Sequence, residues 1–167
     1  RGYARLGSTD MAGGVTGLAD YDAGTRLIAS ATDGKWYERA SGDWTAVTGA
    51  TGYDTGADTR WSFAMFYGAT TAANLLVGCN GIDAPQKYTS SAGASALGGG
   101  WPATCKYPTP WIGRLIMADG DTIRGSRVND CEQMGRANGG FEIQVDRGSG
   151  DITGLTTFAG QITIFKR

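Results

Sequence analysis

The amino-acid sequence predicts an all-β fold, arranged as a β-propeller-like array of four-stranded antiparallel meanders. Apolar residues alternate with polar ones or form short runs bounded by Gly, Asp and Asn, and no amphipathic helical pattern stands out. A phrase also recurs near the two ends, as Val-Thr-Gly-Leu at residues 15–18 and Ile-Thr-Gly-Leu at residues 152–155. A Gly-containing turn and a β-rich run follow each copy, which is the pattern of a hairpin.

The second strand of the predicted hairpins recurs at the spacing of propeller blades. Strands anchored on Leu27, Leu75, Leu115 and Ile162 are separated by 48, 40 and 47 residues. A blade of four short strands with its turns takes roughly 40–50 residues. The sequence therefore predicts a lead-in strand or arm, three blades and the start of a fourth, at residues 1–13, 14–50, 51–100, 101–147 and 148–167.

In the first blade, a hairpin at residues 15–29 opens the meander. The dipeptide Asp33-Gly34 is a strong hairpin turn signal and predicts a third strand at residues 35–39. A Ser-Gly-Asp turn then leads to a fourth strand at residues 44–47.

The second blade has three predicted strands and a low-complexity end. Its strands are expected at residues 61–67, 74–79 and 86–88, separated by turn residues. Gly, Ser and Ala dominate residues 89–100, so we expect a flexible loop with a weak fourth strand there.

The third blade is expected to start at its prolines, because proline cannot donate a ladder hydrogen bond. Pro108 and Pro110 precede a pair of strands around the Gly113 turn. Further strands are predicted at residues 122–127 and 141–145, with one helical turn between residues 130 and 136.

Three blades and the start of a fourth cannot close a ring, since propellers typically use about four to eight blades. The sequence begins without Met and stops directly after a predicted strand. We therefore expect the chain to be a fragment of a longer polypeptide. Its remaining blades would follow Arg167, or the array would stack against other chains.

The charge pattern excludes a global attraction of nucleic acid and leaves a local contact through arginines open. The net charge is −1 at pH 7, so there is no global basic field to attract nucleic acid. Arginines are nevertheless loosely grouped at Arg114, Arg124, Arg127 and Arg136. The group is either a solvated surface, which is the more common case, or a local patch that faces DNA or an acidic partner.

Catalytic and metal-binding motifs are missing from the sequence. The chain has no histidine, which excludes Ser-His-Asp and Cys-His catalysis and histidine metal sites. Cys79, Cys105 and Cys131 lack CxxC spacing, so we expect reduced and partly buried thiols, or one disulfide with a free thiol. No run approaches the roughly 20 apolar residues of a membrane span. We expect no enzyme activity, no cofactor or metal, and no membrane span.

Two sets of residues keep sugar chemistry open as an alternative. Carboxylate pairs could serve a propeller glycosidase, but each lies in an apparent turn, where Asp bonds its own backbone. Aromatic residues could stack on sugar rings in a lectin, although filling the space between blades is the favoured interpretation. The pairs are Asp20 with Asp22, Asp54 with Asp58, and Asp119 with Asp121, and the aromatic residues are Trp36, Tyr37, Trp44, Trp61, Trp101 and Trp111.

Three segments carry a resemblance to a known family. They are Arg-Gly-Tyr-Ala-Arg-Leu at residues 1–6, Pro-Thr-Pro-Trp-Ile-Gly-Arg-Leu-Ile at residues 108–116, and the stretch from Asp-Ile-Thr-Gly-Leu at residues 151–155 to Ile-Phe-Lys-Arg at residues 164–167. With these segments the chain resembles the β-propeller virion proteins of tailed bacteriophages. That group includes tail nozzle proteins and the head-completion or packaged-DNA stabilisation proteins of short-tailed phages.

The resemblance implies a structural role in the virion, at the tail or neck, for a protein made in the bacterial cytoplasm. Copies would form a ring homo-oligomer, commonly a hexamer, in contact with other tail, portal and adaptor proteins. The ring would line or close the DNA channel, touch packaged DNA without sequence preference, and act in genome retention and ejection. The alternatives are a carbohydrate-binding β-propeller or lectin-like module and, third, a propeller glycosidase.

Overall fold

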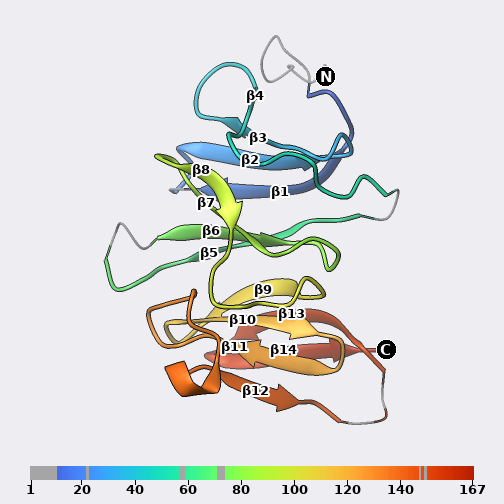
Figure 1. Cartoon of the computed structure of the whole chain (residues 1–167), viewed down its shortest axis with the longest axis vertical. Coiled ribbons are helices and arrows are strands. Elements are labelled where there is room, and N and C mark those ends of the chain that lie inside the picture. Colours follow the sequence, from blue (N-terminus) through green and yellow to red (C-terminus); the bar gives the residue numbers. More distant parts are fainter. Residues whose placement is uncertain (1–10, 22, 57–58, 71–73, 147, 149) are drawn as a thin grey trace.

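The computed structural model describes residues 11–21, 23–56, 59–70, 74–146, 148 and 150–167. Its strands form four antiparallel sheets, which follow one another along the chain and stack through the molecule (Figure 1). We call these sheets blades 1 to 4 in chain order. The predicted all-β, propeller-like class is confirmed, and the blades do not close into a ring. Most of the predicted lead-in, residues 1–10, lies outside the described residues.

Blade 1 is a meander in which each strand pairs with the next. The Asp33-Gly34 turn joins its second and third strands, and Gly34 has a φ of 74°, which favours glycine. The fourth strand has only two residues. The strands are β1 (Val15–Tyr21), β2 (Arg26–Ala31), β3 (Trp36–Arg39) and β4 (Thr45–Ala46).

Blade 2 repeats the meander, and its last strand lies in the segment expected to be a flexible loop. The weak fourth strand expected there is present as Gly93–Ala96, which pairs with the preceding strand. The Ala94 amide also donates to the Thr48 carbonyl of blade 1, 2.9 Å away, so backbone bonds on two sides hold a segment of small residues. The strands are β5 (Ser62–Phe66), β6 (Leu75–Cys79), β7 (Gln86–Thr89) and β8 (Gly93–Ala96).

Blade 3 begins earlier than the prolines suggested. Pro108 and Pro110 lie inside its first strand, which is the edge strand of the sheet and pairs on one side only. The expected helical turn is a 3-10 helix, η2 (Arg136–Asn138), placed later than predicted. The strands are β9 (Lys106–Trp111), β10 (Arg114–Asp119), β11 (Thr122–Gly125) and β12 (Phe141–Gln144).

Blade 4 is a hairpin of β13 (Ile152–Phe158) and β14 (Gln161–Lys166), and it matches the hairpin of blade 1 residue by residue. Leu18 pairs with Ala29, and in the same place Leu155 pairs with Ile164. The register shifts once in each hairpin, between Val15 and Gly17 and between Ile152 and Gly154. The repeated phrase therefore encodes one structural unit, including its bulge.

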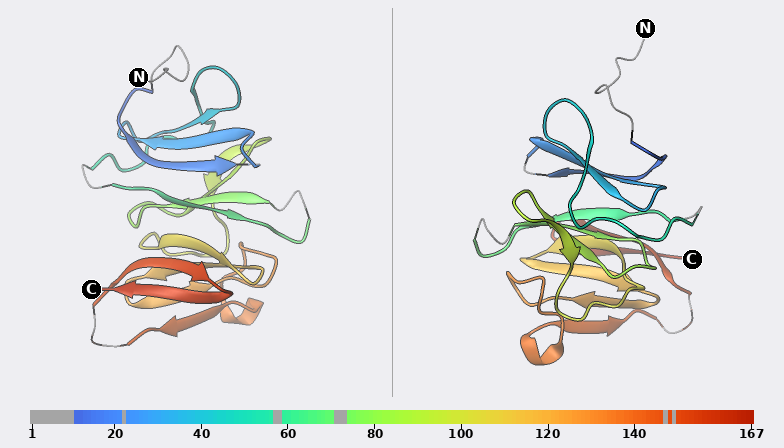
Figure 2. Two further views of the ribbon diagram at one scale, coloured as in Figure 1. Left: turned by 180° about the vertical axis from the view of Figure 1, so that it is seen from behind. Right: turned by 45° about the horizontal axis from the view of Figure 1, so that its top comes forward.

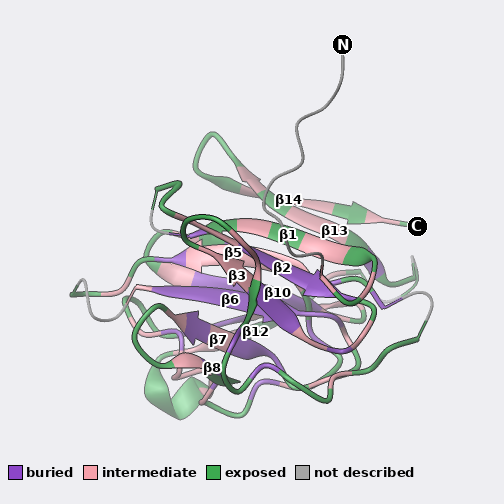
Figure 3. Ribbon diagram, turned by 90° about the horizontal axis from the view of Figure 1, so that it is seen from above, coloured by how far each residue is buried: buried purple, intermediate pink, exposed green. Residues whose placement is uncertain are grey.

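Apolar cores fill the spaces between successive blades, and the first strands β1, β5, β9 and β13 lie side by side in that order (Figure 2). Buried residues accordingly run through the middle of the stack (Figure 3). Core 1/2 consists of Tyr21, Ile28, Trp36, Val47, Ala50, Trp61, Leu76, Tyr88 and Ala94. Core 2/3 consists of Phe66, Leu75, Val77, Cys79, Leu97, Trp101, Cys105, Leu115, Met117 and Cys131. Core 3/4 consists of Ile116, Ala118, Ile123 and Ile152, with Leu155, Ile162 and Ile164 packed against them.

Candidate functional site

Two of the four candidate arginines bond the backbone around η2. The Arg114 guanidinium donates to the Gly139 carbonyl at 2.8 Å and to the Ser126 carbonyl, and it lies 5.6 Å from the centre of the Phe141 ring. Such a cation–π contact adds to the hydrogen bonds that hold the side chain in place. Arg136 begins η2 and donates to a carbonyl of β12 at 3.3 Å. Arg114 is therefore half-buried and fixed, whereas Arg136 is exposed.

Arg127 lies next to the same turn. It is exposed, and its side chain packs beside Gly139, which ends η2 with a φ of 85°. Its own amide bonds the Gln133 carbonyl at 2.7 Å, which fixes the backbone of the loop that carries it. The fold therefore gathers Arg114, Arg127 and Arg136 around one turn of blade 3, although they are far apart in sequence.

Arg124 is set apart from the other three by its two carboxylate partners. Its Nε donates to Asp119 and its Nη1 to Glu142, each at 2.8 Å. Burial opposes the charge on the guanidinium, but the bond to Asp119 and the nearby Glu142 outweigh this effect, and the pKa of Arg124 is raised. Two carboxylates compensate its charge, so Arg124 adds little to a positive surface. The exposed charges of the group are those of Arg127 and Arg136.

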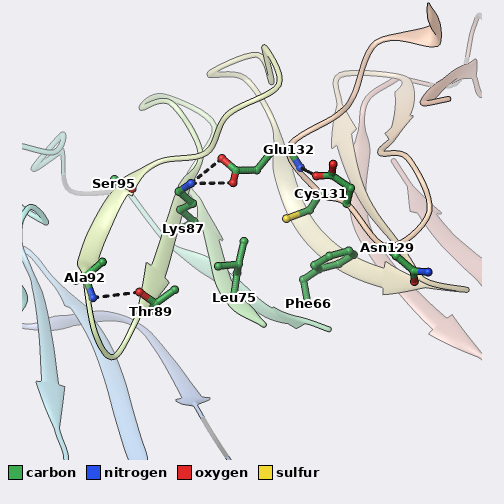
Figure 4. A pocket seen from close by; sticks show the side chains of 11 residues that line it. Phe66, Leu75, Lys87, Thr89, Ala92, Ser95, Asn129, Cys131 and Glu132 are labelled. Carbon is green, nitrogen blue, oxygen red and sulfur yellow. Dashed lines mark hydrogen bonds and ion pairs between the residues drawn. The ribbon is translucent and has the colours of Figure 1, made fainter. Parts of the chain in front are cut away.

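A cleft of about 490 Å³ lies between blade 2 and the loop that follows Arg127 (Figure 4). Lys87 of β7 reaches across it and donates to both carboxylate oxygens of Glu132, at 2.7 and 2.8 Å. Glu132 also accepts a bond from the Gly98 amide at 2.9 Å. Burial alone would raise the pKa of Glu132, but Lys87 and the Gly98 amide together lower it. The ion pair joins blades 2 and 3 at the rim of the cleft.

The floor of this cleft is apolar and has no activated nucleophile. Phe66 and Leu75 of blade 2 and Cys131 line it (Figure 4). Burial, followed by the charges of Glu132 and Asp130, raises the pKa of the Cys131 thiol to about 12. A thiol with that pKa stays protonated at neutral pH and does not attack a substrate. The cleft can hold a small, partly apolar group, and the thiol that lines it is not an activated nucleophile.

The three cysteines are free and buried in core 2/3, in agreement with the expectation of reduced thiols. Burial raises the pKa of the Cys105 thiol to about 12 and places that of Cys79 well above its usual value. Among the described residues, no group of three or more His, Cys, Asp or Glu side chains is arranged to hold a metal ion.

The described members of the carboxylate pairs all accept hydrogen bonds, Asp20 and Asp54 within their own turns, Asp119 from Arg124 and Asp121 from Gln144 of neighbouring strands. Asp20 accepts from the Gly24 amide at 2.7 Å, and Asp54 accepts from the Gly56 amide at 2.6 Å. The Gly56 bond lowers the pKa of Asp54, and a bond from Gln144 likewise lowers that of Asp121. The lowered pKa of Asp54 and of Asp121 is the opposite of the raised pKa that a glycosidase acid needs. Asp22 and Asp58 lie outside the described residues.

Three of the six aromatic candidates lie in the cores between blades, as favoured from the sequence. Trp36 and Trp61 meet edge to face in core 1/2, with ring centres 4.8 Å apart. Trp101 lies in core 2/3, where its indole donates to the Cys131 carbonyl at 2.9 Å. Tyr37 is buried on the outward side of blade 1, and Trp44 and Trp111 are half-buried.

Sequence reasoning missed the exposed apolar residues on the outward sides of the array. Phe158 and Phe165 of blade 4 are 77 % and 54 % exposed, and Leu18 of blade 1 is 60 % exposed. The signal that could have found them is the repeated phrase itself. Once one hairpin is placed between blades, the matching residues of the other are identified by position.

Comparison with known proteins adds no assignment. No protein-family model matches the chain, and a search of curated proteins finds no significant match. Within the described part of the chain, no helix has the length and apolar character needed to cross a membrane.

Proposed function

We propose that this chain is a structural virion protein of a tailed bacteriophage, a component of the tail nozzle or hub or of the head-to-tail connector. It acts through contacts with other subunits and carries out no catalytic reaction. In the particle it lines or closes the DNA channel, so that the genome is retained until ejection. Its partners are further copies in a ring, with a hexamer favoured, and the neighbouring tail, portal and adaptor proteins.

The observation that carries this proposal is an array of blades whose two outward sides are left open by the residues that the structure describes. Phe158 on one side and Leu18 on the other are exposed apolar side chains on sheet faces. Phe165 lies on the same face as Phe158, and Val15 on the same strand as Leu18, and neighbouring exposed apolar residues of this kind favour a surface that a partner covers. The phage assignment itself rests on the resemblance of the three sequence segments described above.

Contact with packaged DNA is assigned to the two exposed arginines around η2. Arg127 and Arg136 present their charge to solvent, whereas the charge of Arg124 is compensated by two carboxylates. Such contacts are electrostatic and independent of base sequence. We expect replacement of both Arg127 and Arg136 by Ala to weaken DNA retention in the particle and to leave the fold intact.

The experiment that tests the assignment is electron cryomicroscopy of the particle that contains this chain. Density for the blades in the neck or tail, on the axis that the DNA follows, would support the proposal. Purification of the native chain as a free protein with no particle would overturn it. Finding the chain on the outer surface of a particle, bound to glycans, would replace it with the carbohydrate-binding alternative.

DNA contact is tested separately by the salt dependence of binding to duplex DNA of mixed sequence. Loss of two phosphate contacts should lower the slope of log Kobs against log salt by about 2. The matched control is Arg60→Ala, which removes an exposed arginine that precedes β5 in blade 2. Equal slopes for the double variant, the control and the unaltered chain would remove these arginines from the proposal.

A further inference from the structure

The outward face of blade 4 is an uncharged sheet surface with two exposed aromatic residues. Cross-strand pairing puts Phe158 opposite Gln161, Thr156 opposite Thr163, and Gly154 opposite Phe165, so these six residues share one face. The other face, with Leu155, Ile162 and Ile164, packs on blade 3. We call the six residues the blade 4 face. In Figure 3, β13 and β14 lie at the outside of the stack and are coloured exposed or intermediate along most of their length.

The matching face of blade 1 is buried under the next blade. Because the two hairpins share their register, Tyr21 occupies the place of Phe158, and Ile28 occupies that of Thr163. Tyr21 is only 8 % exposed and Ile28 is fully buried, since blade 2 covers both. One position is therefore buried under a following blade in the first hairpin and open in the second.

The glycines at the two bulges, Gly17 and Gly154, differ in what lies next to them. A Cβ on Gly17 would lie 2.5 Å from the Trp61 carbonyl oxygen and 2.9 Å from the Phe63 ring, so blade 2 closes directly onto blade 1 at this point. At Gly154 the nearest ring belongs to Phe165 of the same hairpin, 3.2 Å from that Cβ position. In the blade 4 face, therefore, a ring of the same hairpin lies beside the glycine, in the place that blade 2 occupies over Gly17.

The outward face of blade 1 also has exposed apolar side chains. Leu18 corresponds to Leu155, which packs on the preceding blade, yet Leu18 is 60 % exposed. Its cross-strand neighbour Ala29 is fully buried, Val15 at the start of the same strand is 54 % exposed, and Asp20 on the same side of the sheet is exposed. We call Val15, Leu18 and Asp20 the blade 1 face. By its position in the repeat, it is the side of a hairpin that packs on the blade before it.

We propose that the blade 4 face of one chain binds the blade 1 face of a second copy, so that copies associate head to tail. The partner is a sheet and not a nucleic acid, because the blade 4 face has no charged side chain to meet phosphate. The contact continues between chains the packing that joins blades within the chain. This inference concerns the chain of 167 residues itself and holds whether or not the chain comes from a virion.

A head-to-tail contact uses two different surfaces, so it leaves one of each free at the ends of every assembly. Such heterologous contacts extend into rings or open chains, whereas a contact of one face with itself would stop at a dimer. The association should depend on concentration and should change little with salt, because the blade 4 face has no charged side chain to pair with one on the other face.

The test is sedimentation velocity of the chain over a wide concentration range, with variants that place a charge on each face. Phe158→Glu and Leu18→Glu should each raise the dissociation constant by at least about tenfold, because a charge would be buried without a partner. Both side chains are exposed, so the fold should survive, as a thermal melt will check. Ile82→Glu, which changes a loop residue that is 53 % exposed, is the matched control and should associate like the unaltered chain.

Mixing the two variants tests whether the copies associate head to tail. Each variant keeps the face that the other has lost, so an equimolar mixture should form a dimer of one copy of each and nothing larger. Monomers in that mixture, or an unaltered chain that stays monomeric at every concentration, would overturn the proposal. Association that persists in both single variants would also overturn it. None of these results depends on where the chain lies in a particle, so the two proposals fail separately.

Discussion

Core 1/2 and core 2/3 fill the same kind of space with different chemistry. Core 1/2 is aromatic, with Trp36 at its centre in contact with Trp61 and Phe63, whose rings lie 4.8 and 4.9 Å away. Core 2/3 has two aromatic residues, Phe66 and Trp101, and otherwise consists of aliphatic side chains, Met117 and three thiols. The two cores are both well buried, so the fold requires filled volume between blades and does not prescribe which residue types supply it.

The polar atoms at the edges of the two cores differ as well. In core 1/2 the Tyr88 hydroxyl donates to Glu38, and Tyr53 at its margin donates to Gln86 at 3.1 Å. In core 2/3 the buried thiols are weak hydrogen-bonding groups, and the charged pair of Lys87 and Glu132 lies outside at the cleft. Core 1/2 is therefore tied to its surface by hydroxyl groups, whereas core 2/3 borders the cleft through Phe66, Leu75 and Cys131.

The largest loss of stability is expected from truncating Trp36, the residue at the centre of core 1/2. Trp36→Ala should lower the free energy of unfolding by about 3–5 kcal/mol, because a fully buried indole leaves a cavity that its neighbours cannot fill. Chemical denaturation followed by tryptophan fluorescence and circular dichroism measures this change. Trp44→Ala, at a half-buried position of the same blade, is the control and should cost much less. Equal losses for the two variants would contradict a central role for Trp36.

A smaller loss is expected in the thiol core. Met117→Ala should cost about 3 kcal/mol, since Met117 is fully buried and loses its packing with blade 2. Met117→Leu keeps the volume and should cost under about 1.5 kcal/mol in the same denaturation experiment. A leucine variant as unstable as the alanine variant would show that this core depends on specific shape and not on volume.

Alkaline pH separates the cores by their titrating groups. Burial raises the pKa of Cys131 from 9.0 to about 12, and burial raises that of Tyr53 from 10.0 to about 12. Stability from a raised pKa is complete below the unfolded value and is lost as pH rises through the folded value. The Cys131 thiol should therefore cost about 1.4 kcal/mol of stability between pH 8 and pH 10, and Tyr53 should cost less because its unfolded pKa is higher.

The variant that checks this is Cys131→Ala, compared with Tyr53→Phe. The loss of stability between pH 8 and pH 10 should shrink by about 1.4 kcal/mol in the cysteine variant only. Urea denaturation at the two pH values gives the difference directly. A phenylalanine variant that reduces this loss as much as the alanine variant does would reverse the assignment of the alkaline transition to the thiols.

A moderate effect is expected at the polar edge of core 1/2. Tyr88→Phe should cost about 1 kcal/mol, because the variant keeps the ring and loses only the bond to Glu38. Glu38 keeps its pairing with Arg26 at 3.2 Å, so no buried charge is left unpaired. Equilibrium denaturation of this variant at pH 7 would contradict the prediction if its stability equalled that of Tyr88→Ala.

The smallest contribution to stability is expected from the ion pair of Lys87 and Glu132 at the cleft. A double-mutant cycle of Lys87→Met and Glu132→Gln should give a coupling of about 0.5–1 kcal/mol, because both side chains are partly exposed. The pKa of Glu132 is lowered, so its contribution is present above the usual pKa of 4.5 and is lost as the pH falls through the folded value. Thermal unfolding of the four proteins at pH 7 and pH 4 measures the coupling energy and its dependence on pH. A coupling energy that is the same at pH 4 as at pH 7 would contradict the prediction.

The period of the blades could be predicted from sequence because the core repeats it. Leu27, Leu75, Leu115 and Ile162 all fall in the second strand of their sheet. The β9 strand was missed since its prolines look like breakers until the strand is known to be an edge. The pairing of Arg124 with Asp119 and Glu142 was missed too, because cross-strand register decides which carboxylates reach it.

Packing between successive blades has a consequence for how the molecule opens. Each sheet rests mainly on its neighbours in the chain, so local stability approximates a sum over adjacent interfaces, as in a one-dimensional chain of coupled units. Blades 2 and 3 have an interface on both sides, whereas blades 1 and 4 have one each. Amide hydrogens should accordingly exchange first in β14 and β4 and last in β6 and β10, with fraying that proceeds inward from both ends of the stack.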